Sequence, residues 1–266
     1  MSTSYGNALS NKISTRKLYS ASHQCPAGCK YCFAKWTDTY LTQPVFGSET
    51  IDGDSSVIYP CCDGELFVQG TYIDEMKKLS ESTNKMYLSI STKCGLDQKT
   101  FNAIADFNSF LVQNQKGFVK LSISLATKTM IDVIEPGTLS YNSRLELLKQ
   151  IVETGLPTSI TLKSVIPFVS NTEYFDIIDD CSKIVDKLLV GGLYINEKSM
   201  FFKQFIQGKF RTVLREVSWL IDHPIWPYVD QDEKIIEIST YAAKLNMQVF
   251  DTDVDLIRAL CIEKEG

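Results

Sequence analysis

The chain has 266 residues and a net charge of −5, with 44% hydrophobic and 22% charged residues. This composition is typical of a globular protein with a full core, and it excludes a disordered or collagen-like chain. The acidic balance argues against a protein that binds duplex DNA through an overall positive field, and leaves open only a local basic face. No apolar run reaches the length of a membrane span, and residues 1–14 lack the apolar core of a signal peptide. We therefore expect a cytoplasmic protein with no membrane partner.

Short apolar runs alternate with longer helical patterns along the chain. The expected strands are residues 17–20, 56–60, 86–91, 119–125, 159–165 and 188–195. The expected helices are residues 72–82, 101–112, 144–153, 173–187 and 232–245. The tail, residues 247–261, has the pattern of a last strand followed by a short helix.

Six strand–helix units in this order predict an α/β fold with a parallel sheet and outer helices. Six units do not complete an eight-unit barrel, so the expected architecture is a partial (βα)6 TIM-like barrel. No long Pro/Gly/Ser linker divides the chain. We therefore expect a flexible N-terminus over residues 1–14 and a single domain over residues 15–266. In such sheets the chemistry gathers at the carboxyl ends of the strands.

Three of the eight cysteines fall within eight residues, directly after the first expected strand: Cys25, Cys29 and Cys32. In a chain of this length and cytosolic character, clustered cysteines indicate a metal or catalytic site rather than a disulfide framework. Three thiolates can bind three irons of a [4Fe–4S] cube and leave the fourth iron open to a substrate or cofactor. Phe33 and Trp36 are placed to shield such a cluster from water.

Two other interpretations of the cysteine motif remain open. One is a zinc site, for which His23 would be the fourth ligand. The other is a chance grouping of buried cysteines. Among the other cysteines, Cys94 follows a strand end and is expected to face the site, whereas Cys181 and Cys261 lie in helical patterns and are expected in the core.

The spacing Cys25-x3-Cys29-x2-Cys32, with the aromatic Tyr31 before the last cysteine, resembles the defining motif of the radical S-adenosylmethionine (SAM) superfamily. The resemblance implies that SAM chelates the open iron and that the reduced cluster cleaves it to methionine and a 5′-deoxyadenosyl radical. That radical abstracts hydrogen from a substrate, which the sequence does not identify. The resemblance also implies an electron donor such as flavodoxin or ferredoxin.

Residues after the second strand resemble a second motif of this superfamily. Asp63-Gly64-Glu65 is similar to its Gly-Gly-Glu motif, whose groups bind the SAM amino group. Asp63 replaces the first glycine, which departs from the pattern. The alternative is an ordinary Asp-Gly turn.

Polar residues at later strand ends extend the expected SAM site. Lys93 can pair with the SAM carboxylate, and the resemblance implies that Ser122 and Ser124 contact the ribose. The alternatives are a solvated lysine at the start of a loop and two small residues that pack inside the barrel. Lys163, on the fifth strand, is a further candidate.

Within the superfamily, the nearest likeness is to the spore photoproduct lyase-like group. It rests on residues 28–34, on Ser91-Thr92-Lys93 and on the run Glu135-Pro136-Gly137…Arg144-Leu145…Gly155…Val165-Ile166-Pro167. In that group a cysteine just before the strand-two loop donates a hydrogen to the product radical. Cys61 and Cys62 stand in this place, which implies Cys62 as a catalytic hydrogen donor. The alternative is two small buried residues at a strand end.

Residues 198–215 interleave lysines and arginines with four phenylalanines, a pattern that can hold a nucleic-acid backbone and stack on bases. The alternative is an amphipathic helix with its aromatic residues in the core. Trp219, Trp226 and Tyr228 are expected to close the open side of the barrel. The sequence thus supports two hypotheses: a radical SAM enzyme, or a non-enzymatic zinc or iron–sulfur module that binds nucleic acid.

Overall fold

The computed structural model describes residues 15–20, 25–32, 34, 56–62, 64–68, 72–217 and 224–265. Several expectations from the sequence lie outside these residues: the N-terminal segment 1–14, His23, Phe33, Trp36, Asp63 and Trp219.

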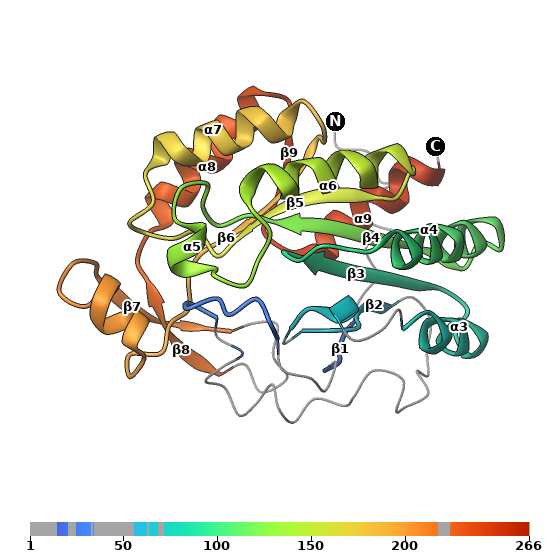
Figure 1. Cartoon of the computed structure of the whole chain (residues 1–266), viewed down its shortest axis with the longest axis horizontal. Helices are drawn as coiled ribbons and strands as arrows, with labels where there is room; N and C mark the ends of the chain where they lie inside the picture. Colours follow the sequence, from blue (N-terminus) through green and yellow to red (C-terminus); the bar gives the residue numbers. More distant parts are fainter. Residues whose placement is uncertain are drawn as a thin grey trace, which may run out of the picture.

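A parallel sheet forms the centre of the described part of the chain (Figure 1). Its seven strands lie in the order β1 (Thr15–Leu18), β2 (Ser56–Tyr59), β3 (Met86–Thr92), β4 (Gly117–Ser124), β5 (Thr158–Lys163), β6 (Lys187–Gly191) and β9 (Gln248–Phe250). The six expected strands are confirmed, and the tail adds the seventh. Because the spatial order follows the chain order and all pairs are parallel, the carboxyl ends of successive strands meet at one edge.

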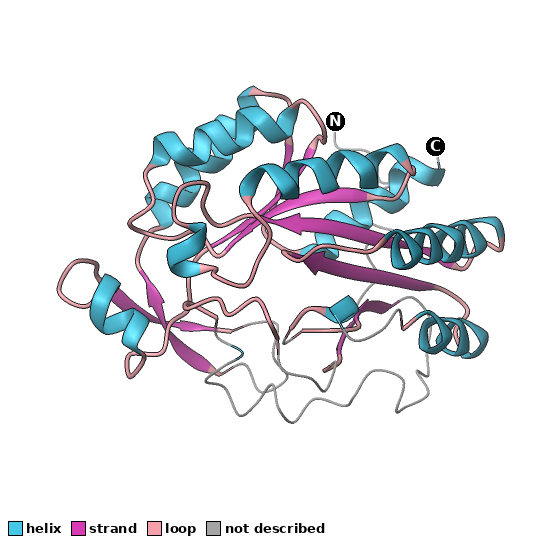
Figure 2. Ribbon diagram, viewed as in Figure 1, coloured by secondary structure: helices cyan, strands magenta, loops and turns pink. Residues whose placement is uncertain are grey.

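Helices follow the strands in alternation, as Figure 2 shows by colour. They are α3 (Ile73–Ser82), α4 (Gln98–Gln113), the short α5 (Ile131–Ile134), α6 (Tyr141–Glu153), α7 (Asn171–Ser182), α8 (Asp232–Lys244) and α9 (Asp253–Glu265), with a 3-10 turn, η2 (Leu66–Val68), after β2. Three of them begin at a polar cap. The side chains of Asp97, Ser140 and Ser170 accept a backbone N–H from the first turns of α4, α6 and α7.

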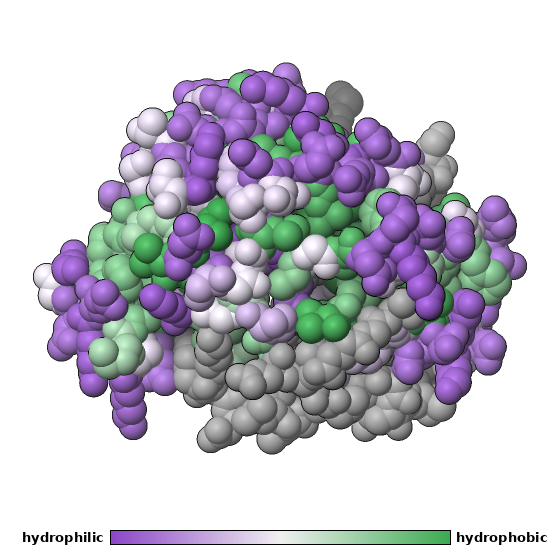
Figure 3. Space-filling view, viewed as in Figure 1, coloured by the Kyte–Doolittle hydropathy of each residue, from purple (hydrophilic) through white to green (hydrophobic). Residues whose placement is uncertain are grey.

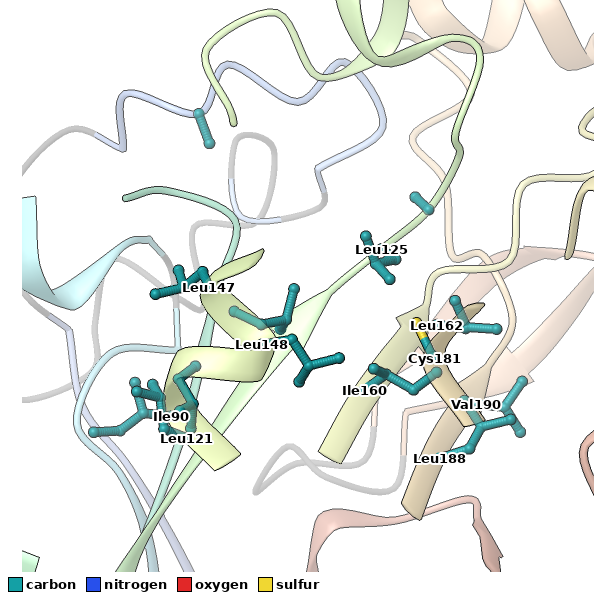
Figure 4. Packing of buried hydrophobic residues seen from close by; sticks show 14 of the residues in the cluster. Ile90, Leu121, Leu125, Leu147, Leu148, Ile160, Leu162, Cys181, Leu188 and Val190 are labelled. Carbon is teal, nitrogen blue, oxygen red and sulfur yellow. The ribbon is translucent and has the colours of Figure 1, made fainter. Parts of the chain in front are cut away.

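One face of the sheet packs against α3, α4, α6 and α7 through apolar side chains that alternate along the strands. Figure 4 shows part of this core, drawn from Ile90, Leu121, Leu125, Leu147, Leu148, Ile160, Leu162, Cys181, Leu188 and Val190. The expected core position of Cys181 is confirmed. On the outside, hydrophilic side chains predominate over the helices in the view of Figure 3.

The opposite face of the sheet, which we call the inner face, is covered at one end by α9. Tyr87, Phe118 and Leu189 pack there against α9, and Cys261 lies in the same buried group, as expected. The next inner-facing position on β4 is Lys120, which is fully buried. Its ammonium lies 2.6 Å from the Asp253 carboxylate at the start of α9. This buried ion pair therefore fixes α9 to the centre of the sheet.

Residues 198–215 do not form one helix, and that part of the alternative is wrong. The segment contains a short π-helical turn, η3 (Phe202–Ile206), and then strand β7 (Thr212–Glu216), which pairs antiparallel with β8 (Ile225–Val229). Its aromatic residues do pack in the core: Phe201 is buried there, and Phe202, Phe205 and Phe210 pack against the same cluster. Arg211 and Arg215 pair with Asp230 and Asp232. The basic residues nearest the hairpin are thus partly neutralised by local carboxylates.

Removal of Asp253 should destabilise the protein strongly, because it leaves the fully buried Lys120 ammonium without its counter-charge. We expect Asp253→Ala to lower the free energy of unfolding by about 3–5 kcal/mol. The measurement is urea denaturation followed by circular dichroism. Glu146→Ala, which breaks an exposed pair with Lys149, is the control and should cost less than about 1 kcal/mol. Equal losses in the two variants would contradict the inferred anchoring of α9.

Candidate functional site

The cysteine loop follows β1 at the carboxyl edge of the sheet. Cys25, Cys29 and Cys32 are all free thiols; Cys29 is buried and the other two are half-buried. Gly28 has φ 63°, a conformation that glycine adopts without strain. The Cys32 amide donates to the Cys29 carbonyl at 3.3 Å and tightens the last part of the loop. Three thiols are thereby carried on one short, turned segment.

The backbone of this loop is docked on the segment after α5. The Lys30 amide donates to the Ile134 carbonyl at 2.9 Å, and the Gly137 amide donates to the Ala27 carbonyl at 3.0 Å. A Cβ atom on Gly137 would lie 2.0 Å from the Pro26 carbonyl oxygen, so a side chain there would push the two segments apart. Glycine at this position is what allows the loop to lie flat on its support.

The loop after β2 also touches the cysteine loop. A Cβ atom on Gly64 would lie 3.3 Å from the Cys25 Cβ and 3.6 Å from the Cys61 sulfur. Gly64 therefore packs against Cys25, so the loop after β2 and the cysteine loop are in contact at this edge of the sheet. Cys61 flanks the same point, and the spacing of the sequence motif gave no sign of this thiol.

Cys62 lies in different surroundings from Cys61. It is half-buried and packs in a small apolar cluster around Val217, with Leu18, Tyr194 and Trp226. Val217, just after β7, therefore brings the hairpin against Leu18 at the end of β1, and the closing role expected of Trp226 stays a prediction. Cys62 as a hydrogen donor stays a prediction.

Glu65 joins β2 to the end of β3. Its carboxylate accepts the Thr92 hydroxyl at 2.6 Å and the Lys93 amide at 2.8 Å, and the side chain is buried. Burial raises the pKa of this carboxyl in spite of these two hydrogen bonds.

The neighbouring Cys94 is half-buried, and its sulfur lies 3.8 Å from the Gly137 carbonyl oxygen. Burial raises the pKa of the Cys94 thiol to about 12.

The Lys93 ammonium lies at the centre of the site. It donates to the Tyr31 hydroxyl at 2.6 Å, lies 2.9 Å from the Glu135 carboxylate and approaches the Cys29 sulfur at 3.7 Å. Its side chain is only 13% exposed, so it is not the solvated lysine of the alternative reading. Burial works against the charge, but Tyr31 and Glu135 outweigh it and raise the lysine pKa well above its ordinary value.

Glu135 and Arg144 complete this network, although sequence reasoning gave them no role. The two side chains are fully buried and lie 2.7 Å apart. Arg144 also donates to the Leu139 carbonyl at 2.9 Å and the Ser124 carbonyl at 3.0 Å. Burial of Glu135 opposes its ionisation, but the charges of Lys93 and Arg144 lower its pKa to about 2. The only signal in the sequence was that both residues stand in the run 135–144 that carries the resemblance.

The two serines of β4 lie on the inner face at its carboxyl end. Ser124 is buried next to Arg144, whose guanidinium its carbonyl accepts. Ser122 is fully buried and exchanges a hydrogen bond of 2.8 Å with Ser159 on β5. Lys163 points elsewhere: its ammonium donates to the Asp251 carbonyl at 2.6 Å. The structure therefore brings together Cys29, Lys93 and the carboxyl end of β4. Ser122 lies on the same face of β4, two residues before Ser124 and further from that end.

The three thiols on one short loop are a donor set that suits a [4Fe–4S] cluster, in which each thiolate would bind a different iron. His23, the fourth ligand of the zinc interpretation, lies outside the described residues. Among the residues that the structure describes, no three His, Cys, Asp or Glu side chains are grouped so as to hold one metal ion. Burial raises the pKa of Cys25 and Cys29, and Lys93 partly offsets this at Cys29. Iron binding would thus release protons from these thiols.

Comparison with solved structures finds this fold in two radical SAM enzymes. A spore photoproduct lyase mutant with bound AdoMet and dinucleoside spore photoproduct has a TM-score of 0.57 at 11% identity, covering 94% of this chain and 85% of the lyase. The lyase complexed with dinucleoside spore photoproduct has a TM-score of 0.56 at 13% identity, with the same coverage.

Streptococcus suis SuiB bound to S-adenosylmethionine has a TM-score of 0.50 at 14% identity, over 90% of this chain and 47% of SuiB. The chain thus spans about half of that protein. No family sequence model and no curated protein sequence matches the chain. At these identities the likeness establishes the fold, which confirms the expected partial barrel. No helix among the described residues is long and apolar enough to cross a membrane.

The low pKa of Glu135 should make stability depend on pH. Its folded pKa of about 2 lies below the ordinary 4.5, so its contribution is present above pH 4.5 and is lost as the pH falls towards 2. Between pH 6 and pH 3 we expect the wild type to lose about 2 kcal/mol more of its free energy of unfolding than Glu135→Gln. Denaturant titrations at several pH values measure this difference. Glu146→Gln, on the exposed surface, should follow the wild type; parallel curves for Glu135→Gln would refute the assignment.

Proposed function

We propose that the protein is a radical SAM enzyme with one [4Fe–4S] cluster that acts on a substrate still to be identified. One observation carries the proposal. The three-cysteine loop lies at the carboxyl edge of the sheet, against Gly64 and Lys93 from the neighbouring strand ends. The same fold occurs in two enzymes whose structures contain bound SAM, and this supports the proposal.

Cys25, Cys29 and Cys32 would hold three irons of the cluster, leaving the fourth open. When bound, the reduced cluster supplies one electron to SAM, which yields methionine and a 5′-deoxyadenosyl radical that abstracts hydrogen from the substrate. The chain's own contribution is to fix the loop and to keep water away. The backbone hydrogen bonds between the loop and residues 134–137 fix the loop, and the burial of Cys29 keeps water away.

The SAM site would lie beside this loop. Gly64 leaves the room for a close approach at Cys25, and Glu65 supplies a buried carboxylate for the amino group. Ser122 and Ser124 line the inner face at the end of β4, where a ribose can be held. Asp63 belongs to the same proposed set, whereas Lys93, which the sequence also assigned to it, contacts Cys29 and Tyr31 of the cysteine loop.

Cys62 is proposed as the group that returns a hydrogen atom to a substrate radical, leaving a thiyl radical on its sulfur. Its packing against Val217 and Trp226 keeps one side of the thiol dry, which suits radical chemistry. The reductant of the cluster would be a small electron-transfer protein such as flavodoxin or ferredoxin.

The substrate class is open within this proposal. One lyase structure holds a dinucleoside spore photoproduct, and a SuiB structure holds the precursor peptide SuiA. A dinucleoside and a peptide are therefore both bound by proteins with this fold, and the fold alone does not choose between them.

Anaerobic reconstitution tests the proposed function. The wild type should bind four irons and four sulfides (one [4Fe–4S] cluster) and show the absorption and electron paramagnetic resonance signals of that cluster. With dithionite it should convert SAM to 5′-deoxyadenosine. Cys29→Ala should lose the cluster signal and the product. Cys181→Ala removes a thiol from the distant core and is the matched control, which should keep both.

Two results would overturn the proposal. One is a cluster that forms without any cleavage of SAM. The other is tight zinc binding with salt-dependent binding of nucleic acid, which is the outcome expected for a non-enzymatic metal module.

A further inference from the structure

We propose that Glu135 and Arg144 are positioning residues that aim the Lys93 ammonium at the Cys29 sulfur, where it donates a hydrogen bond to the cluster ligand. The inference rests on the proposed function, because it concerns the cysteine as a thiolate ligand. In this inference Lys93 donates a hydrogen bond to Cys29 of the cysteine loop, in place of the pairing with the SAM carboxylate that the sequence led us to expect.

The geometry around Lys93 uses all of its donors. An ammonium has three N–H groups, and three acceptors lie around it: the Tyr31 hydroxyl, the Glu135 carboxylate and the Cys29 sulfur. Two of these acceptors, Tyr31 and Cys29, are on the cysteine loop itself. A turn of the ammonium towards a ligand outside this set would break one of the three contacts.

Both carboxylate oxygens of Glu135 are engaged, so Glu135 cannot move with the Lys93 ammonium if the ammonium turns. One carboxylate oxygen contacts Lys93 and accepts the Tyr31 hydroxyl, and the other contacts Arg144. Arg144 is itself fixed, since it donates to the carbonyls of Leu139 and Ser124 and to the Thr138 hydroxyl. The Leu139 amide in turn donates to the Lys93 carbonyl at 3.0 Å. The contacts of Glu135, Arg144 and Leu139 therefore fix the position of the Lys93 ammonium.

The charges of the network leave one positive charge for the loop. Lys93 and Arg144 carry two cations, and Glu135 carries one anion, all buried or nearly so. Among the described contacts of Lys93, the Cys29 sulfur is the acceptor that becomes an anion when it binds iron. Cluster formation would therefore neutralise the network rather than add an unpaired charge to it.

A hydrogen bond to a ligating sulfur changes what the cluster can do. Such bonds, and nearby positive charge, stabilise the reduced and more negative state, and so raise the reduction potential. Lys93 would make the cluster easier to reduce by its electron donor. This differs from a role in SAM binding, which would change the affinity for SAM and leave the potential of the SAM-free cluster alone.

The test compares Lys93→Met and Glu135→Gln with the wild type after anaerobic reconstitution. The reduction potential of the SAM-free cluster is measured by a redox titration followed by electron paramagnetic resonance. SAM affinity is measured separately by equilibrium binding. Asp180→Asn is the matched control, because Asp180, on α7, accepts from a lysine and a tyrosine, Lys128 and Tyr141, in a similar trio outside the cysteine loop.

We expect Lys93→Met to assemble the cluster with a more negative potential, and both variants to lose iron to a chelator about 10-fold faster than the wild type. Glu135→Gln also removes an anion from the network, which by itself raises the potential, so the rate of iron loss is the measurement for this variant. The SAM affinity of both variants should be unchanged, and Asp180→Asn should match the wild type in every measurement. Lys93→Arg keeps a cation at this position and should stay closer to the wild type than Lys93→Met. Because the Lys93 side chain is 13% exposed whereas Glu135 is fully buried, Lys93→Met remains informative if Glu135→Gln fails to fold.

An unchanged potential in Lys93→Met, with SAM binding weakened about 10- to 100-fold, would overturn the inference and restore the SAM-carboxylate role. In that case the wild type still forms its cluster and cleaves SAM, so the proposed function survives. A wild-type protein that forms no [4Fe–4S] cluster would instead overturn the proposed function and this inference together.

Discussion

The carboxylate of Glu135, buried between the cations of Lys93 and Arg144, connects the cysteine loop to the ends of β3 and β4. Through Lys93 it reaches the end of β3, through Arg144 it reaches β4 and α6, and through Tyr31 it reaches the cysteine loop. Burying such a charge is costly, and only a complete set of partners offsets that cost. Loss of one member leaves the others unpaired, so the network permits one arrangement of these segments.

The order of the strands brings the members of this network within reach of one another. Because β1 to β4 are neighbours in chain order, their carboxyl ends lie side by side at one edge. The cysteine loop, the Gly64 loop and the start of the loop after β3 leave from this edge, and the segment after α5 folds back over it. On the inner face, α9 occupies the far end of the sheet through Lys120 and Asp253, which leaves the carboxyl end of the inner face to the site.

The likeness to the lyase and to SuiB concerns the fold and does not extend to the side chains at the edge of the sheet. A sheet with this strand order presents the same edge to solvent whatever residues follow the strands, so proteins of low identity can share a fold and differ in what they bind. What is particular to this chain is the set of side chains around the edge: the thiols of Cys61 and Cys94, and the hairpin of β7 and β8 that packs near Cys62. In the enzyme that we propose, substrate choice would depend on these residues.

The sequence by itself determined the alternation of strands and helices, because apolar periods of two and near four depend on neighbouring residues only. It also determined the cysteine loop, whose three thiols lie within eight residues. The single helix considered for residues 198–215 is wrong, since the helical turn at Phe202–Ile206 is soon followed by β7. Only the tertiary structure decided that Glu135 meets Tyr31, which is 104 residues away. A local pattern carries no information on such a contact, because the register of the sheet and the docking of the loops create it.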